Sequence, residues 1–399
     1  MDMEKKYLIV NPGSASRKYA VYSDGIEIFR THFERENGGF VVAKKNADHE
    51  EKIKISEREF DESAEKTLAF LIADGIIADK NEISAVGFRI VASGDYFIKT
   101  KLIDGEYVKK LTEVQEMAPL HISAALSEIQ KFTALIRGVP FVGVSDSAFH
   151  ATMPEKARLY ALPIEITREL GIYRFGYHGI SVQSVLRTAR ELIGKIPSRI
   201  IVCHLGSGSS ITAVKDGKCL DTSMGFTPLE GVVMGTRPGD IDAGALIYLA
   251  KKLNLSPSEL DEFLNQKCGL FGLSGKTNDV RELIALSEKG DENAKLALEI
   301  FAYRVQKYIG AYFAALGGLD LLIFTAAIGE RSAIIRNLIC QGLGALGVKI
   351  DGEKNSRMVE KDGFIETGES AVKIAAIKTD EMAEIAREMI NLNRLKARE

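Results

Sequence analysis

The sequence predicts an α/β protein made of two related domains. Its 399 residues exceed what a single hydrophobic core usually serves, which favours two domains. A unit of strand, polar loop, strand and turn occurs near residues 7–25 and again near residues 199–217. Stretches with helical apolar spacing alternate with these strands. We therefore expect two α/β domains that divide near Phe149 and face each other across a cleft.

The first copy of the unit begins with the apolar residues 7–10, a predicted strand. A polar loop over residues 11–16 leads into a second strand at residues 18–22. The dipeptide Asp24-Gly25 then predicts a tight hairpin turn into a third strand.

The second copy repeats this order, with an apolar run at residues 199–203, a loop at 206–210 and a strand at 211–214. Its hairpin signal is Asp216-Gly217, and both loops carry Gly-Ser-x-Ser. Each half should therefore contribute one glycine and serine loop to the cleft.

Helices are predicted between the strands. A capping box of Ser56 and Glu59 opens one of them, which continues to Gly75. Phe60, Ala64, Leu68 and Leu71 share its apolar face. Further helices are expected at residues 123–136, 256–264, 294–316 and 332–343.

Composition favours small-molecule partners in the cytoplasm. A formal net charge of -3 gives no electrostatic footprint for nucleic acid or for an anionic membrane. We find no signal-peptide core and no run long enough to span a bilayer. The four cysteines, Cys203, Cys219, Cys268 and Cys340, show neither disulfide nor zinc spacing.

The two Gly/Ser loops are candidate phosphate-binding sites. Successive backbone N–H groups in a glycine turn can surround phosphate oxygens, and serine hydroxyls add donors. The predicted strand at 321–325, followed by a loop and a helix, is a third context in which nucleotides bind. Asp279 and Arg281 could contact a ribose or base edge. Ordinary turns and helix capping remain the alternatives for these segments.

Several charged side chains could act on a phosphoryl group. Arg89 ends a predicted strand, and Arg237 lies in a glycine-flanked loop, so each could bind phosphoryl or carboxylate oxygens. An ion pair with Asp240 or Asp242 is the structural alternative for Arg237.

Three other polar side chains are open to two interpretations. His178 fits either a catalytic or a structural histidine. Asp146 and Glu381 are carboxylates that could bind Mg²⁺, or could lie in solvated turns.

Taken together, these segments resemble the acetate kinase family of the actin-like ATPase superfamily, whose domains are ribonuclease H-like. The resemblance runs from residue 7 to residue 387 and is strongest in DTSMGFTPLEGVVMGTR at 221–237, NPGSASRK at 11–18 and CHLGSGSS at 203–210. Residues 149–163 and 324–330 also match. It implies an N-terminal domain over residues 1–148, a C-terminal domain over 149–383, and a final helix, 384–399, that packs back on the first domain.

The resemblance implies reversible Mg²⁺- or Mn²⁺-dependent transfer of the γ-phosphoryl group of ATP to a short-chain carboxylate, giving acyl phosphate and ADP. Acetate is the first expectation and propionate the next, in a homodimer formed through the C-terminal domain. A carboxylate acceptor is already ionised at neutral pH, so this chemistry needs positioning and charge stabilisation rather than a general base.

Site residues are implied position by position. The family's catalytic set matches Arg89, Asp146, His178 and Arg237, and its metal site matches Asn11 and Glu381. Phosphate and nucleotide contacts match Ser14, Ser16, Lys18, His204, Leu205, Gly206, Ser207, Gly208, Ser209, Asp279, Val280, Arg281, Ala327, Ile328, Gly329, Glu330 and Arg331. The acyl pocket matches Arg89, Val91, Leu120, Tyr177 and Pro228.

The implied roles divide as follows. Arg89 and Arg237 bind the acceptor carboxylate and the transferring phosphoryl group. His178 donates a hydrogen bond to phosphoryl oxygens, and Asp146 binds the metal or orients its water.

The chain departs from the family pattern at several positions. Polar family residues are replaced at Phe88, Ala92, Ile122 and Val182, which predicts a more apolar acceptor side and leaves propionate or butyrate open. Ser207, Ala327 and Arg331 differ in the nucleotide loops, which leaves GTP, phosphate or pyrophosphate open as donors. A nucleotide-binding regulator without turnover, and a kinase or phosphatase with a hydroxyl acceptor and Asp146 as general base, are the alternatives from other classes.

Overall fold

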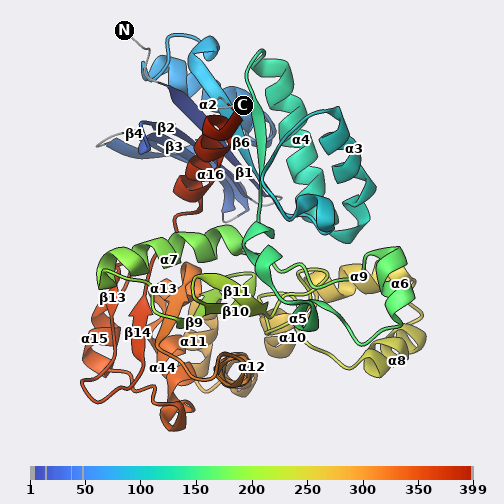
Figure 1. The fold of residues 1–399 in the computed structure, drawn as a ribbon, viewed down its shortest axis with the longest axis vertical. Helices are drawn as coiled ribbons and strands as arrows, with labels where there is room; N and C mark the ends of the chain where they lie inside the picture. Colours follow the sequence, from blue (N-terminus) through green and yellow to red (C-terminus); the bar gives the residue numbers. More distant parts are fainter. Residues whose placement is uncertain (1–4, 14–15, 37, 47–48, 397–399) are drawn as a thin grey trace. The chain divides into compact units, whose positions relative to one another are not determined.

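The computed structural model describes residues 5–13, 16–36, 38–46 and 49–396. The chain divides into two compact units (Figure 1), a first unit of Met1–Ala148 with Asp380–Glu399 and a second unit of Phe149–Thr379. The second division falls before Asp380 rather than after residue 383, because helix α16 begins at Glu381 and packs as a whole on the first unit.

The first unit contains an eight-stranded mixed sheet with the order β5-β4-β3-β2-β1-β6-β8-β7. Its strands are β1 (Lys6–Pro12), β2 (Ser16–Ser23), β3 (Ile26–Glu36), β4 (Gly39–Asn46), β5 (His49–Ile55), β6 (Ile83–Ile90), β7 (Lys101–Leu102) and β8 (Phe141–Ser145). β1 to β5 form an antiparallel meander, whereas β6 and β8 run parallel to β1. Three carboxyl ends of parallel strands therefore meet at one edge of the sheet.

Helices cover both faces of this sheet. They are α1 (Glu57–Asp61), α2 (Ser63–Ala73), α3 (Gly105–Glu113), α4 (Pro119–Leu135) and α16 (Glu381–Lys396). Gly87 of β6 faces α16 so closely that a Cβ would lie 3.1 Å from Met389 Sδ. The next residue, Phe88, points to the opposite face and contacts Phe132 of α4. Because successive side chains on β6 point to opposite faces, Gly87 faces the helix α16 and Phe88 faces the helix α4.

The helix predicted over residues 56–75 is present as two pieces. Its capping box of Ser56 and Glu59 is confirmed. The helix breaks at Glu62, whose backbone (φ -89°, ψ 26°) leaves the helical region between α1 and α2. The apolar face predicted from the sequence is still buried across both pieces.

The second unit contains a six-stranded sheet with the order β11-β10-β9-β12-β14-β13. Its strands are β9 (Arg199–Leu205), β10 (Ser209–Lys215), β11 (Lys218–Thr222), β12 (Leu321–Thr325), β13 (Gly363–Phe364) and β14 (Lys373–Ala376). β9, β10 and β11 are antiparallel, and β12 and β14 run parallel to β9. The same order and directions occur in β3-β2-β1-β6-β8, so the predicted duplication is confirmed.

The two hairpin turns are also equivalent. Asp24 and Gly25 have φ values of 48° and 81°, and Asp216 and Gly217 have values of 50° and 76°. Positive φ at both central residues is what a two-residue hairpin of the type I′ kind requires.

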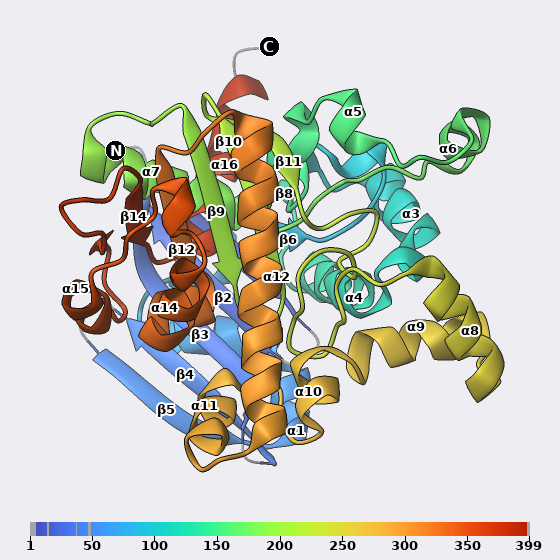
Figure 2. The same ribbon diagram turned by 90° about the horizontal axis from the view of Figure 1, so that it is seen from below.

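Helices of the second unit pack on both faces of its sheet. They are α5 (Glu155–Arg158), α6 (Ile164–Leu170), α7 (Gly179–Ile193), α8 (Ala243–Leu253), α9 (Pro257–Gln266), α10 (Gly269–Ser274), α11 (Val280–Glu288), α12 (Glu292–Leu316), α13 (Ala326–Arg331), α14 (Ala333–Gln341) and α15 (Gly352–Arg357). The long helix α12 crosses β9 and β10 (Figure 2) and shares a core with α14. α7 packs on the other face.

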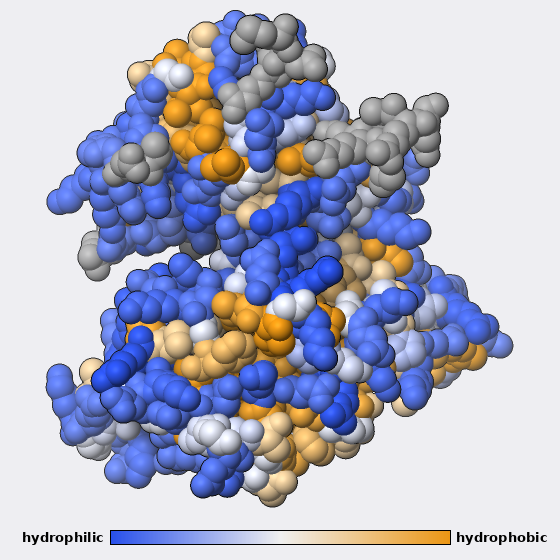
Figure 3. Space-filling model, turned by 60° about the vertical axis from the view of Figure 1, so that its left-hand side comes forward, coloured by the Kyte–Doolittle hydropathy of each residue, from blue (hydrophilic) through white to orange (hydrophobic). Residues whose placement is uncertain are grey.

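Short 3₁₀ turns complete the fold at Lys80–Glu82, Asp95–Phe97, Gln115–Met117, Ala148–Thr152 and Gly344–Leu346. The four cysteines are free. Among the described helices, none has both the length and the apolar character needed to cross a membrane. The face drawn in Figure 3 is mainly hydrophilic, with hydrophobic side chains gathered in separate patches.

Candidate active site

The first unit collects polar side chains at the carboxyl ends of its parallel strands. Asn11 lies near the end of β1, Arg89 near the end of β6, and Asp146 directly after β8. Glu381 is the first residue of α16, which packs on these three strands. Carboxyl edges of parallel strands are where α/β proteins place ligand-binding groups.

Arg89 is the centre of this cluster. Its Nη2 donates to Asp146 Oδ2 at 2.9 Å, and its Nη1 lies 3.2 Å from Glu381 Oε2. Asn11 Nδ2 donates to the same Glu381 oxygen at 3.1 Å. Burial lowers the pKa of Arg89, but the two carboxylates outweigh this and leave the pKa raised. The guanidinium therefore stays charged beside two acidic groups.

The first Gly/Ser loop follows β1, the strand that carries Asn11 of this cluster. A Cβ on Gly13 would approach Ser16 O to 2.6 Å, so the tight turn after β1 requires glycine. Ser16 and Lys18 begin β2, and Lys18 pairs with Asn11 across the ladder. Residues directly opposite in a ladder share a face, so Lys18 is on the same face as Asn11. Ser14 lies outside the described residues.

The second unit brings its own Gly/Ser loop to the ends of β9 and β12. The Gly206 amide donates to Gly208 O at 3.1 Å, and the Gly235 amide donates to Ser207 O at 3.0 Å. A Cβ on Gly208 would lie only 2.7 Å from Arg237 Nη2, so the backbone passes directly beside the guanidinium. Glycine at position 208 therefore lets the loop backbone pass next to a fixed positive charge.

Arg237 is a half-buried cation without an acidic partner. Its Nη1 donates to Pro228 O at 2.8 Å, and no carboxylate of a described residue forms an ion pair with it. Burial lowers its pKa to about 10. The predicted alternative of an ion pair is not observed. Asp240 accepts from the Gly231 amide and Tyr308, and Asp242 caps α8.

His178 lies at the start of α7 in a left-handed conformation (φ 62°, ψ 19°). Such a backbone is uncommon for a residue with a Cβ and is held here by the surroundings. Its Nδ1 forms a hydrogen bond with Ser210 Oγ at 2.9 Å, and its ring stacks on His204 with centroids 3.9 Å apart. A Cβ on Gly208 would lie 3.3 Å from His178 Nε2, which places that nitrogen beside the loop.

The segments matched to nucleotide contacts have mixed surroundings. The Glu330 carboxylate accepts from the amides of Ala326 and Thr379, each at 2.9 Å, and so fastens the end of β12 to the segment after β14. Burial raises the pKa of Glu330, which these backbone donors partly offset. Arg331 is exposed and pairs with Glu360 at 2.9 Å.

Asp279 is the N-cap of α11 and pairs with Arg281, as the capping alternative predicted. A Cβ on Gly235 would lie 3.6 Å from Asn278 Cβ and 3.4 Å from Ser207 O. The segment that precedes α11 therefore lies close to the second Gly/Ser loop.

Residues matched to an acyl pocket lie in both units. In the first unit, Val91 directly follows β6. In the second unit, Pro228 is buried and accepts from Arg237, and Tyr177 donates to Phe226 O at 2.8 Å. The side chain of Leu120 lies outside the described part of the chain.

Four of the departures lie in hydrophobic cores. Phe88, Ala92 and Ile122 belong to the core of the first unit, and Val182 belongs to that of the second. Phe88 stacks on Phe141, with ring centroids 5.8 Å apart. Their apolar character is thus accounted for by packing within each unit.

The first-unit cluster fits a hard divalent cation. Within the described residues no group of three or more His, Cys, Asp or Glu side chains is arranged to hold a metal. Mg²⁺ does not need one, because it commonly binds one or two carboxylates, substrate phosphates and waters. Asn11, Asp146 and Glu381 supply such oxygen ligands.

One buried residue beside the segment matched to nucleotide contacts was missed from the sequence. Arg336 of α14 is fully buried and donates to Gly329 O at 2.8 Å and Glu330 O at 2.9 Å. It also donates to Asn355 and Met358. An arginine within an amphipathic helix gives no signal that it will turn inward to bind carbonyl groups.

Known proteins match the chain along nearly its whole length. A model described as the Acetokinase family matches residues 6–387. An acetate kinase of Dictyoglomus thermophilum is 45% identical over 395 residues, 97% of this chain and 99% of that protein. Crystal structures of Porphyromonas gingivalis acetate kinase (TM-score 0.86, 36% identity, 97% of this chain and 99% of that one) and a Francisella tularensis propionate kinase (0.88, 37%, 96% and 98%) are also similar.

Proposed function

Because the chain belongs to the acetokinase family, we propose that it transfers the γ-phosphoryl group of ATP reversibly to a short-chain carboxylate. The products are an acyl phosphate and ADP. The acceptor carboxylate attacks phosphorus, the bond to the bridging oxygen of ADP breaks, and no proton has to be removed from the acceptor. The protein's task is therefore to hold the reactants and to stabilise negative charge.

The observation that carries this proposal is Arg237 beside Gly208. A half-buried guanidinium that pairs with no carboxylate lowers the stability of the folded protein unless a bound anion neutralises its charge. Loop amides and a cation at one place are the groups that bind transferring phosphoryl oxygens. His178 Nε2, on the same side of the loop, supplies a further contact.

In the first unit, we assign Arg89 to the acceptor carboxylate or the phosphoryl group. Asp146 and Glu381 orient its guanidinium from two sides. Mg²⁺, or Mn²⁺ in its place, would be held by Asn11, Asp146 and Glu381 and would neutralise charge on the nucleotide phosphates.

Acetate is the first acceptor we propose, and propionate the second. A curated acetate kinase is the relative at 45% identity, and a propionate kinase is among the similar structures. Since Phe88, Ala92, Ile122 and Val182 belong to hydrophobic cores, they do not by themselves favour a longer acyl chain. ATP is the proposed donor, because the exposed Arg331 is already paired with Glu360.

A hydroxamate assay tests the function. Purified protein with Mg-ATP is offered formate, acetate, propionate, butyrate and isobutyrate, and hydroxylamine traps any acyl phosphate. The best acceptor is repeated with GTP and with pyrophosphate. Hydroxamate with acetate or propionate is expected, and its absence with every pair from folded protein would move the nucleotide-binding regulator to first place.

We also propose a homodimer that forms through the second unit and acts in the cytoplasm. α8 has an apolar sequence, yet none of its side chains is buried. Ile247 and Tyr248 are 58% and 64% exposed. A second copy of this chain would cover them, and the four free cysteines fit a reducing compartment.

A further inference from the structure

Arg17 occupies the start of β2, directly after the first Gly/Ser loop, between Ser16 and Lys18. Successive side chains on a strand point to opposite faces. Lys18 is on the face of Asn11, which contacts Glu381. Arg17 therefore points to the other face.

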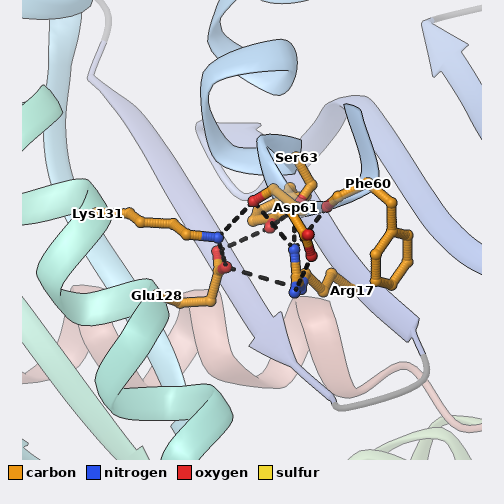
Figure 4. Close-up of polar contacts among 7 residues, drawn as sticks. Arg17, Phe60, Asp61, Ser63, Glu128 and Lys131 are labelled. Atoms are coloured by element: carbon orange, nitrogen blue, oxygen red, sulfur yellow. Dashed lines mark hydrogen bonds and ion pairs between the residues drawn. The ribbon is translucent and has the colours of Figure 1, made fainter. Parts of the chain in front are cut away.

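On that face Arg17 is held by several groups at once (Figure 4). Its Nη1 donates to Phe60 O at 2.6 Å and to Ser63 Oγ at 3.0 Å, at the break between α1 and α2. Its guanidinium carbon lies 4.6 Å from the centroid of the Phe60 ring. Its Nη2 and Nε lie 3.7 Å from Asp61 Oδ1 and 3.8 Å from Glu128 Oε1.

Glu128 of α4 is the buried anion of this network, with 1% exposure. Its Oε2 accepts from the Tyr19 hydroxyl at 2.7 Å, and its Oε1 from Lys131 Nζ at 3.2 Å. Because Tyr19 donates to Glu128, Ser63 must be the donor in its 2.8 Å contact with the Tyr19 oxygen. Lys131 also donates to Asp61 O at 2.6 Å.

The network thus joins Arg17, which follows the first Gly/Ser loop, to the α1–α2 segment and to α4. A buried carboxylate with two cations and a phenol as partners is strongly tied to them, and removing Arg17 leaves Lys131 as its remaining cation. The position of Arg17 along β2 is consequently set by α1, α2 and α4 as well as by the sheet.

We propose that Arg17, with Glu128 as its counter-ion, is a positioning residue of the first phosphate loop. By fixing the first residues of β2, it keeps Ser16 and Lys18 on the face that carries Asn11 and Glu381. The inference rests on the proposed function, in which this loop binds nucleotide phosphates. Small displacements of such groups are costly, because binding and transfer need the groups in place beforehand.

The first test is Arg17→Met, studied well below its melting temperature. The KM for Mg-ATP should rise about tenfold, the size of effect expected when a residue that orients binding groups is removed. The KM for the carboxylate should change by less than about twofold. Arg35→Met is the matched control: Arg35 is also stacked on a phenylalanine, Phe40 at 5.0 Å, but is exposed on β3. It should leave both constants unchanged.

A double variant separates positioning from stability. Arg17→Met with Glu128→Leu removes the buried carboxylate together with Arg17 and leaves Lys131 bonded to Asp61 O, so its melting temperature should recover in part while the KM for Mg-ATP stays high. Arg17→Lys, which keeps the charge, should fold even if Arg17→Met does not, and should show an intermediate KM for Mg-ATP. The proposal is overturned if Arg17→Met lowers only the melting temperature, or if the double variant restores the KM.

Failure of the proposed function would look different. Lys18→Ala should raise the KM for Mg-ATP while leaving the melting temperature unchanged, since Lys18 is exposed. If Lys18→Ala has no effect on that KM, the loop is not part of the nucleotide site. If wild-type protein forms no acyl phosphate at all, the family activity itself is absent.

Discussion

Arg237 donates to the carbonyl oxygen of Pro228 at 2.8 Å and pairs with no carboxylate of the described residues. This contact orients the guanidinium without neutralising it. The positive charge therefore remains available to a substrate oxyanion, at a cost to the stability of the folded protein.

Replacing Arg237 by methionine should separate activity from stability. We expect kcat/KM to fall about 10²-fold or more, because charge that develops on the phosphoryl group loses its fixed partner. The melting temperature should stay equal or rise, since an unpaired charge is removed. Steady-state kinetics and calorimetry measure the two effects. A lower melting temperature with unchanged kcat/KM would make Arg237 a structural residue.

Glu381→Gln should weaken the response to Mg²⁺. The Mg²⁺ concentration for half-maximal rate is expected to rise about tenfold or more, because the proposed carboxylate ligand becomes a neutral amide. Titration of the initial rate with Mg²⁺ at fixed ATP measures this change. Glu369→Gln, at an exposed position of the second unit, is the control. An unchanged Mg²⁺ dependence would remove Glu381 from the metal site.

His32 should make the stability of the protein depend on pH below neutrality. Burial, together with Lys18, Arg30 and Lys52, lowers its pKa from 6.5 to about 4. Between these values the unfolded chain binds more protons than the folded one, so stability is lost as the pH falls from about 6.5 towards 4. Urea unfolding at several pH values should show less of this loss in His32→Gln.

The control for this prediction is His49→Gln, at an exposed histidine of β5. Its unfolding should follow the wild-type pH dependence. The prediction would be contradicted if an NMR titration gave His32 a pKa near its ordinary value.

Arg336→Met should destabilise the second unit. Its guanidinium makes five hydrogen bonds to acceptors of Gly329, Glu330, Asn355 and Met358. Leaving such buried acceptors without donors should cost about 3 kcal/mol or more. Chemical denaturation measures this loss. Arg357→Met, at an arginine of α15 that is 78% exposed, should change stability by less than about 0.5 kcal/mol.

The exposed side chains of α8 provide a test of the proposed dimer. Ile247→Asp should shift the protein from dimer to monomer, because a charge in an apolar interface must lose its water without finding a partner. Light scattering after size-exclusion chromatography measures the mass. Leu192→Asp on α7, at a residue 43% exposed, is the control. A wild-type protein that is already monomeric would contradict the dimer.

The sequence predicted the fold well where local chemistry decides it. The two aspartate-glycine turns and the strand at Leu321–Thr325 are present where the pattern placed them. The Gly/Ser loops were recognised because a close backbone approach requires glycine, as at Gly208. The contact between Arg89 and Asp146 could be anticipated only through the resemblance to the family, because it depends on the parallel pairing of β6 and β8.

Other features depended on packing that sequence patterns do not record. The replacements at Phe88, Ala92, Ile122 and Val182 were interpreted as an altered acceptor side; these side chains pack in hydrophobic cores, and their effect on the acceptor stays a prediction. Arg331 was expected near the nucleotide base or ribose; its exposed ion pair with Glu360 was not foreseen, and the contact with the nucleotide stays a prediction. Neither outcome could be read from residue type, because burial and partner choice are set by elements distant in the sequence.

The packing of α16 on β1, β6 and β8 has a consequence for synthesis of the chain. The second unit is one continuous segment and can fold as soon as it leaves the ribosome, whereas the first unit waits for its last helix. Until residue 381 emerges, the sheet face around Gly87 is uncovered and Arg89 lacks one of its two carboxylates. A nascent chain would thus gain the complete first-unit cluster only after residue 381 has emerged and α16 has packed on the sheet.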